Sequence, residues 1–157
     1  MDVNSVIQSL LESKWDATNV TTPVFRQLEF DATSPSLQIL LEVFPARTTW
    51  VISGLYRVEH RCRITLYQKL IHYRPEDISG YNTLWFKVKD EIDRILRENK
   101  YNYTVTGINN IILGTWMDNI PSMRLGRGTK GIREPIVWIS EQIIICTYYK
   151  DSGLTVS

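Results

Sequence analysis

Residues 55–67 read Leu-Tyr-Arg-Val-Glu-His-Arg-Cys-Arg-Ile-Thr-Leu-Tyr, and uncharged side chains alternate with charged or polar ones along this stretch. Because successive side chains of a strand point to opposite faces, the alternation predicts a strand with one buried face and one charged face. The charged face includes Arg57, Arg61 and Arg63. We expect these arginines to contact another subunit, a phosphate backbone or carboxylates. The alternative is a solvated face whose charges contribute little, as is usual for exposed charges.

The periodicity of the remaining sequence predicts two helices and further strands around this one. We expect a helix at 2–14, an extended connection at 15–36 with a short strand at 24–30, a strand at 37–44, a helix at 79–99, strands at 101–107 and 108–116, and a final strand at 136–149. The strands at 37–44 and 55–67 should form an antiparallel hairpin with a long loop at 46–54. The predicted fold is a single α+β domain over residues 1–157, in which two helices pack on one face of a mainly antiparallel sheet.

The segment at 79–99 has the clearest helical period. Its apolar stripe consists of Leu84, Trp85, Val88, Ile92, Ile95 and Leu96. Acidic residues precede basic ones by four positions in two pairs, Asp90 with Arg94 and Asp93 with Arg97. We therefore expect the stripe to pack on the sheet and both pairs to lie on the outer face of the helix.

Composition places the chain among ordinary folded proteins. Its 157 residues fit one domain, and 43% hydrophobic with 22% charged residues is typical of a soluble globular protein. The net charge of +1 argues against a dedicated DNA-binding domain. Five tryptophans and eight tyrosines are many for this length, and such residues are enriched at protein–protein interfaces. The longest apolar runs, such as 143–146, are too short to span a bilayer, and the first residues do not resemble a signal peptide. Cys62 and Cys146 have no CxxC spacing, which predicts reduced core cysteines and intracellular synthesis.

No catalytic or cofactor-binding motif stands out. His60 falls on the buried side of its predicted strand, where a core histidine is expected, and His72 follows that strand; neither neighbours a nucleophile or paired acids. The stretch 126–131, Gly-Arg-Gly-Thr-Lys-Gly, has the composition of a phosphate loop, but a predicted strand rather than a helix follows it. We therefore expect a protein that is not an enzyme and has no catalytic residue, cofactor or metal. A small enzyme with an unrecognised site is the alternative.

Residues 117–135 combine three glycines, two prolines and four basic residues. This composition predicts a long, mobile loop. Its basic side chains are Arg124, Arg127, Lys130 and Arg133. We expect them to become ordered against a partner, because arginine forms bidentate contacts with carboxylate or phosphate. A disordered, solvated loop is the alternative, and the tail at 150–157 is expected to fray.

The order of the predicted elements resembles that of the tail terminator and tail-completion (head-tail connector) proteins of long-tailed phages and head-tailed archaeal viruses. The segments that carry the resemblance are 3–11, 55–67, 84–99 and 136–149, the last of which follows the basic loop. Members of that family are small α+β subunits that form a hexameric ring closing the head-proximal end of the tail tube. The resemblance implies a structural protein of the virion tail or neck, assembled in the host cytoplasm.

The partners implied by the resemblance are further copies of the chain in a homo-hexameric ring, the tail tube protein, and a head-completion or connector protein. No membrane is implied, and contact with nucleic acid is at most indirect. The family has no catalytic residues; it implies an interface. The residues expected there are Arg57, Arg61, Arg63, Arg124, Arg127, Lys130 and Arg133.

A small nucleic-acid-binding module is the alternative from a different functional class. It would use the basic strand face, with Tyr67 and Tyr73 stacking on bases. The low net charge argues against it, as does the expected position of most aromatic residues on core faces. Salt-dependent binding to an oligonucleotide would separate this alternative from the structural one.

Overall fold

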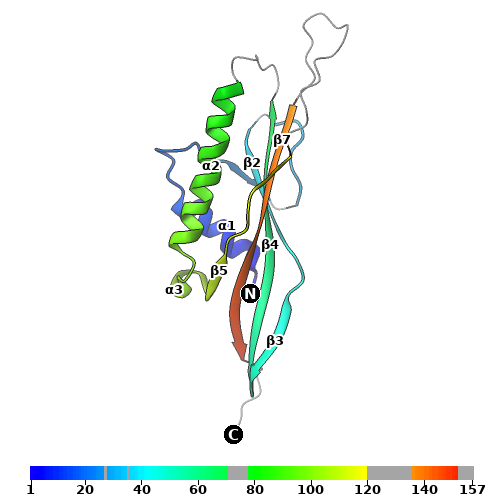
Figure 1. Ribbon diagram of the computed structural model, residues 1–157, viewed down its shortest axis with the longest axis vertical. Helices are drawn as coiled ribbons and strands as arrows, with labels where there is room; N and C mark the ends of the chain where they lie inside the picture. Colours follow the sequence, from blue (N-terminus) through cyan, green and yellow to red (C-terminus); the bar gives the residue numbers. More distant parts are fainter. Residues whose placement is uncertain (27, 35, 71–77, 120–135, 152–157) are drawn as a thin grey trace, which may run out of the picture.

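Two strands of 16 residues, β4 (Leu55–Leu70) and β7 (Ile136–Asp151), pair antiparallel along their whole length at the centre of the sheet (Figure 1). The computed structural model describes residues 1–26, 28–34, 36–70, 78–119 and 136–151. The other strands are β1 (Val24–Arg26), β2 (Gln38–Val43), β3 (Arg47–Ile52), β5 (Asn110–Ile112) and β6 (Met117–Asn119). On one side β2 and β3 pair with β4, and on the other β5 and β6 pair with β7, all antiparallel. Only β1, which joins β2, runs parallel to its neighbour within the described part of the chain.

Helices α1 (Val3–Lys14) and α2 (Ile78–Glu98) both lie on one face of this sheet, and the short α3 (Tyr103–Thr106) follows α2 (Figure 1). The backbone N–H of Ser5 donates to the side chain of Asp2, which caps the start of α1. This arrangement confirms the predicted α+β fold with a mainly antiparallel sheet and helices on one face. Across the described ranges, no helix is long and apolar enough to cross a bilayer.

The core lies between the helices and the sheet. Strand β4 contributes Cys62, Ile64 and Leu66, which are all fully buried. These are alternate residues on the face that the sequence predicts to be buried. The apolar stripe of α2 is also confirmed, with Trp85, Val88, Ile92, Ile95 and Leu96 buried and Leu84 packed at the edge of the core. Helix α1 adds Val3, Ile7, Leu10 and Leu11. Burial of an aliphatic side chain of this size stabilises the fold by about 1.5–3 kcal/mol.

The predicted loop at 46–54 is wrong, because most of it forms β3. This strand pairs with β4 in a register that runs from Arg47 opposite Glu59 to Trp50 opposite Tyr56. Gly54, with φ of 79°, makes the turn between the two strands. The predicted antiparallel pairing of β2 with β4 is confirmed, but it lies farther along β4 than the hairpin. Residues 47–52 are good strand formers that find hydrogen-bonding partners on the long β4.

The predicted strand at 101–107 is also wrong. The backbone N–H of Thr106 donates to the carbonyl of Asn102, and that of Gly107 donates to the carbonyl of Tyr103, which closes the helical turns of α3. Gly107, with φ of 71°, ends the helix in the left-handed region. The Thr106 hydroxyl donates to the Asn102 carbonyl and accepts from the N–H of Ile108, so local side-chain bonds outweigh its β-propensity.

Two further boundaries differ from the prediction. Of the predicted strand at 108–116, only Asn110–Ile112 is paired, as β5. Met117–Asn119, at the start of the predicted loop, form β6 instead. Both short strands pair with β7, which is long enough to give each a partner.

The surface charge pairs of α2 differ from the prediction. Arg94 pairs with Glu91 and with Glu98, where its Nη1 donates at 2.9 Å, and it does not pair with Asp90. Glu91 also accepts from the backbone N–H of Asp16, and this links α2 to the segment after α1. The Glu91 carboxylate is almost fully buried, so its two partners replace the hydration that it loses.

Asp93 lies toward the sheet rather than on the outer face of α2. It accepts from Nε1 of Trp116 at 3.0 Å and from Nε2 of Gln142 at 2.8 Å. Gln142 is buried and Trp116 is partly buried, and an unpaired buried donor costs more than an exposed Asp–Arg pair contributes. The predicted pairing of Asp93 with Arg97 is therefore wrong.

Cys62 and Cys146 are free and buried, as the sequence predicts. Burial raises the pKa of each thiol to about 12. Because the thiolate is the reactive form, we expect neither cysteine to react with a thiol reagent at pH 8 while the protein is folded. After the protein is denatured, both cysteines should react within the dead time of mixing. Fast reaction of one equivalent in the native protein would contradict this placement.

Candidate assembly surfaces

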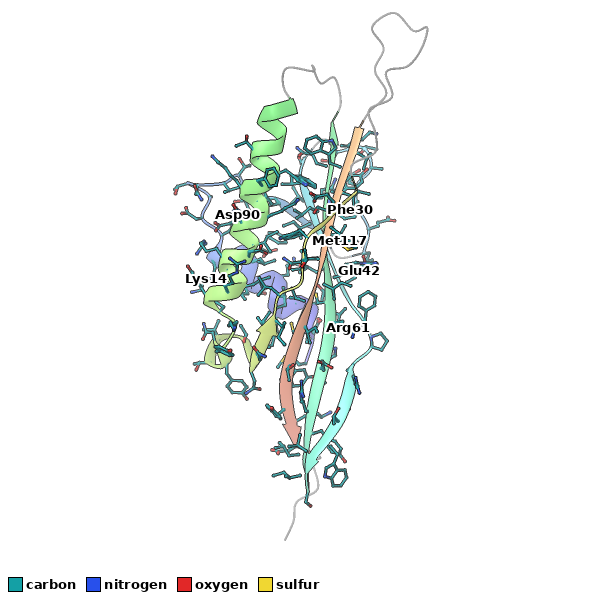
Figure 2. All side chains as sticks on the ribbon, viewed as in Figure 1. Lys14, Phe30, Glu42, Arg61, Asp90 and Met117 are labelled. Carbon is teal, nitrogen blue, oxygen red and sulfur yellow. The ribbon has the colours of Figure 1, made fainter. Side chains whose placement is uncertain are left out.

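The face of the sheet opposite the helices, called the outer face below, carries the three arginines of β4. In the register of β4 with β7, Arg57 lies opposite Tyr149, and Arg61 lies opposite Ile145. Cross-strand partners share a face, so both strands contribute alternate residues to the outer face. Figure 2 shows Arg61 and Glu42 on the side of the sheet away from α2, which carries Asp90. Each of the described helices packs on the other face.

Two of the three arginines are paired. Nη2 of Arg63 donates to Glu42 at 2.9 Å, and this hydrogen bond raises the pKa of the guanidinium. Arg57 lies 3.9 Å from Glu59. Arg61, in contrast, is exposed and has no carboxylate partner among the described residues. The expected basic face is therefore largely neutralised within the subunit, and only Arg61 offers an unpaired charge.

Apolar side chains lie beside Arg61 on the β7 side of the outer face. Ile112 of β5 lies opposite Ile145 of β7, and Met117 of β6 lies opposite Glu141, two residues before Ile143. We define the outer patch as Arg61, Ile112, Met117, Ile143 and Tyr149. Its four uncharged members are 43–62% exposed. Exposed apolar side chains among charges that are mostly paired within the subunit are typical of a protein–protein contact rather than of a phosphate-binding surface.

The sequence alone did not identify the apolar members of the outer patch. The run Ile143–Cys146 is apolar at all four positions, so it contains no alternation to show which residues face outward. Ile112 and Met117 lie on strands of three residues, too short for a period. One sequence signal was available: this strand, β7, has more apolar residues than its single covered face can bury.

The connection after β1 covers the outer face at the other end of β4. The ring of Phe30 stacks on Tyr67 with centroids 4.6 Å apart, and Lys69 donates to the carbonyl of Ala32 at 3.0 Å. Tyr67 is therefore engaged within the subunit and is not presented to a base. Tyr73, the second tyrosine of the nucleic-acid alternative, lies outside the described residues.

The four basic residues of the predicted loop, Arg124, Arg127, Lys130 and Arg133, lie outside the described residues. The strand that precedes them in the sequence, β6, is held to α2 by an ion pair whose lysine is buried. Lys89 is 6% exposed, lies over the rings of Trp85 and Phe86, and donates to Asp118. Asp118 also accepts from the hydroxyl of Ser140 on β7. This cluster fixes β6 to α2 and β7.

Removing Asp118 should destabilise the protein more than removing the charge of Lys89. Burial alone would raise the pKa of Asp118, but hydrogen bonds from Lys89 and Ser140 outweigh burial and lower it. Asp118→Ala leaves a buried ammonium unpaired, and we expect a loss of about 1–2 kcal/mol, discounted because the carboxylate is partly exposed. Lys89→Met, which removes the buried charge itself, should cost less. Denaturant titration of both variants measures the difference.

The same pair gives a pH dependence with a defined sign. A carboxylate with a lowered pKa stabilises the fold above its ordinary pKa of about 4, and this contribution is lost as the pH falls through the lowered value. The stability difference between wild type and Asp118→Asn should therefore be largest near neutral pH and shrink below about pH 4. A difference that stays constant or grows in acid would contradict the pairing.

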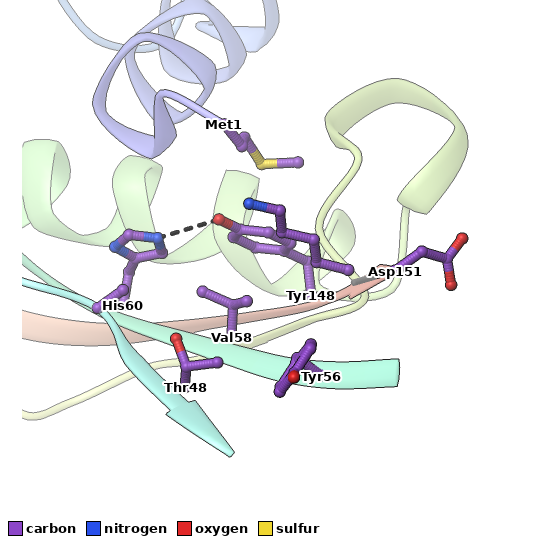
Figure 3. A pocket seen from close by; sticks show the side chains of 9 residues that line it. Met1, Thr48, Tyr56, Val58, His60, Tyr148 and Asp151 are labelled. Carbon is purple, nitrogen blue, oxygen red and sulfur yellow. Dashed lines mark hydrogen bonds between the residues drawn. The ribbon is translucent and has the colours of Figure 1, made fainter. Parts of the chain in front are cut away.

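A hollow of about 400 Å³ opens where the β3–β4 hairpin leaves the sheet (Figure 3). Val58, His60 and Tyr148 point into it, and Met1 lies above them. Nε2 of His60 and the hydroxyl of Tyr148 share a hydrogen bond of 3.2 Å, and the two rings stack. His60 therefore lies on the core-facing side of its strand, as expected. Among the described residues, no cluster of His, Cys, Asp and Glu could hold a metal ion.

Comparison with protein-family models gave no match, and comparison with curated proteins gave no significant match.

Proposed function

We propose that the protein is a structural subunit that assembles with copies of itself into a closed ring, as the tail terminator or neck subunit of a long-tailed virus. The outer patch carries this proposal. The apolar members of this patch are 43–62% exposed in the single subunit, on a sheet face that carries no described helix. A surface of this kind is incomplete until another protein covers it.

The dimensions of the sheet are sufficient for a stable contact. Strands of 16 residues extend about 50 Å at about 3.3 Å per residue. Neighbouring strands lie about 4.8 Å apart, and β5 and β6 follow each other along the same edge of β7, so the outer patch is three strands wide, about 10–15 Å. Together these give several hundred Å², the order of the roughly 800 Å² per partner found in specific interfaces.

The charge distribution favours a protein partner over a nucleic acid. Of the three β4 arginines, Arg57 and Arg63 are already paired within the subunit, which leaves Arg61 for a phosphate. Specific nucleic-acid interfaces neutralise several phosphates with unpaired lysines and arginines. A neighbouring subunit with apolar groups and one carboxylate would complement the outer patch better.

A virion position can be tested directly. Antibodies against the protein, or a fused tag, should label purified particles at the junction of head and tail. Particles that lack the protein should have tails that are open or of abnormal length at their upper end. Absence of the protein from purified virions, with normal particles in a deletion, would contradict the proposal.

A further inference from the structure

The β3–β4 hairpin projects beyond the helices (Figure 1), and its tip carries exposed apolar side chains. Trp50, Val51 and Ile52 are consecutive and 46–62% exposed, and each of the other β3 residues is exposed as well. The hairpin is held in place by the turn at Gly54 and by the edge-to-face contact of Trp50 with Tyr56, with ring centroids 5.4 Å apart. Three exposed apolar residues in succession are unfavourable in water unless a partner covers them.

A second apolar surface lies elsewhere on the same subunit. A groove of about 340 Å³ runs between α1 and α3, where Val6, Leu10 and Val105 provide the apolar floor. Serines 5, 9 and 13 of α1 lie along it. Tyr103 and Val105 are both more than half exposed. The groove is concave and the hairpin tip is convex, so one surface can receive the other.

An exposed arginine beside the hairpin and two carboxylates beside the groove offer charges of opposite sign, although Lys14 also lies in the last turn of α1. Arg47, at the base of the hairpin, is exposed; it lies opposite Glu59 in the register of β3 with β4 but forms no ion pair within the described ranges. Asp2 and Glu12 lie at the two ends of the serine row on α1. A hydrogen bond from the Ser5 hydroxyl lowers the pKa of Asp2, so this carboxylate is charged at neutral pH. Opposite charges at the rim of an apolar contact favour one orientation of the partner.

We propose that the hairpin tip of one copy inserts into the α1–α3 groove of the next copy. This inference rests on the proposed ring and names the contact that would close it. Two different patches on each subunit form a heterologous contact, which generates a ring when the rotation closes. An aromatic side chain buries about 150–250 Å², so Trp50 is the expected anchor of the contact.

Cysteine cross-linking tests the contact and its polarity. We expect Ile52→Cys and Val105→Cys variants to form a covalent dimer with a short bismaleimide only when the two are mixed. Each variant alone should give no dimer, because the native cysteines are buried and like positions do not meet. A dimer from Ile52→Cys alone would mean that the tips meet each other and would overturn the proposal. The absence of a mixed dimer from an assembled protein would overturn it as well.

A surface variant separates this inference from the proposed function. Trp50→Ser with Ile52→Ser should leave folding intact and weaken assembly by about tenfold or more, as expected for loss of a central interface anchor. Phe86→Ser is the control, since Phe86 is equally exposed but lies on α2 away from both surfaces; because its ring contacts Lys89, its thermal melting is measured as well. If the double variant assembles like the wild type, the tip contact is overturned and the ring stands. A wild type that never assembles contradicts both.

Lipid is the competing partner for an apolar hairpin tip with a basic residue nearby. Co-sedimentation with phosphatidylglycerol vesicles tests it. The inference predicts no binding by the assembled wild type, because the tips are covered. Vesicle binding that requires Trp50 and Ile52, with assembly unchanged in the double variant, would assign the tip to a membrane and overturn the inference.

Discussion

Ile92→Asp is expected to leave little folded protein at room temperature. Ile92 is fully buried in the stripe of α2, so the variant loses its apolar burial and places a carboxylate in the core. The combined cost is about 5 kcal/mol or more, comparable to the whole stability of a small domain, about 5–15 kcal/mol. Circular dichroism and denaturant titration should show a lost or strongly shifted transition.

The matched control is Lys87→Asp on the exposed side of the same helix. This variant also introduces an aspartate into α2, but in water, and its stability should change by less than about 1 kcal/mol. An unchanged melting temperature for Ile92→Asp would mean that α2 does not pack on the sheet through this stripe. Equal losses in both variants would point to helix propensity rather than burial.

Ile143→Asp combined with Arg61→Glu is expected to abolish self-association without unfolding the subunit. Both side chains lie in the outer patch, and both are solvent-exposed in the single copy. At a covered interface the new carboxylates would be desolvated and would replace an apolar contact and a cation. Each such change typically costs about 1–3 kcal/mol, so the dissociation constant should rise by about a hundredfold or more.

Lys87→Glu provides the comparison for this double variant, because it also replaces a cation by an anion, on the helical side of the molecule. Assembly of the control should be close to that of the wild type. Thermal melting of both variants as monomers separates loss of association from loss of folding. Unchanged assembly of the double variant would remove the outer patch from the interface.

Long periods in the sequence were sufficient to predict the centre of the fold. Thirteen residues of alternation predicted the buried and exposed faces of β4, and the stripe on α2 predicted its packing residues. Short elements were not predictable in the same way. In α3, hydrogen bonds from Thr106 and Gly107 outweighed the β-propensity of the local sequence, and β6 forms because β7 extends past β5.

The candidate surfaces were predicted in part. The arginines of β4 lie on the outer face as expected, but their pairing with Glu42 and Glu59 depends on neighbouring strands that a linear period does not reveal. The hairpin tip could have been found. Trp50-Val51-Ile52 followed by Ser-Gly is the pattern of a strand entering a tight turn, and it was assigned to a loop.

The proposed ring depends most directly on the mass of the purified protein in solution. Light scattering or native mass spectrometry over a concentration series measures it. The account predicts a discrete closed species well above the subunit mass of 18.3 kDa, expected at six times that mass, which dissociates in the outer-patch variant. A wild-type protein that remains at 18.3 kDa up to millimolar concentration would contradict it.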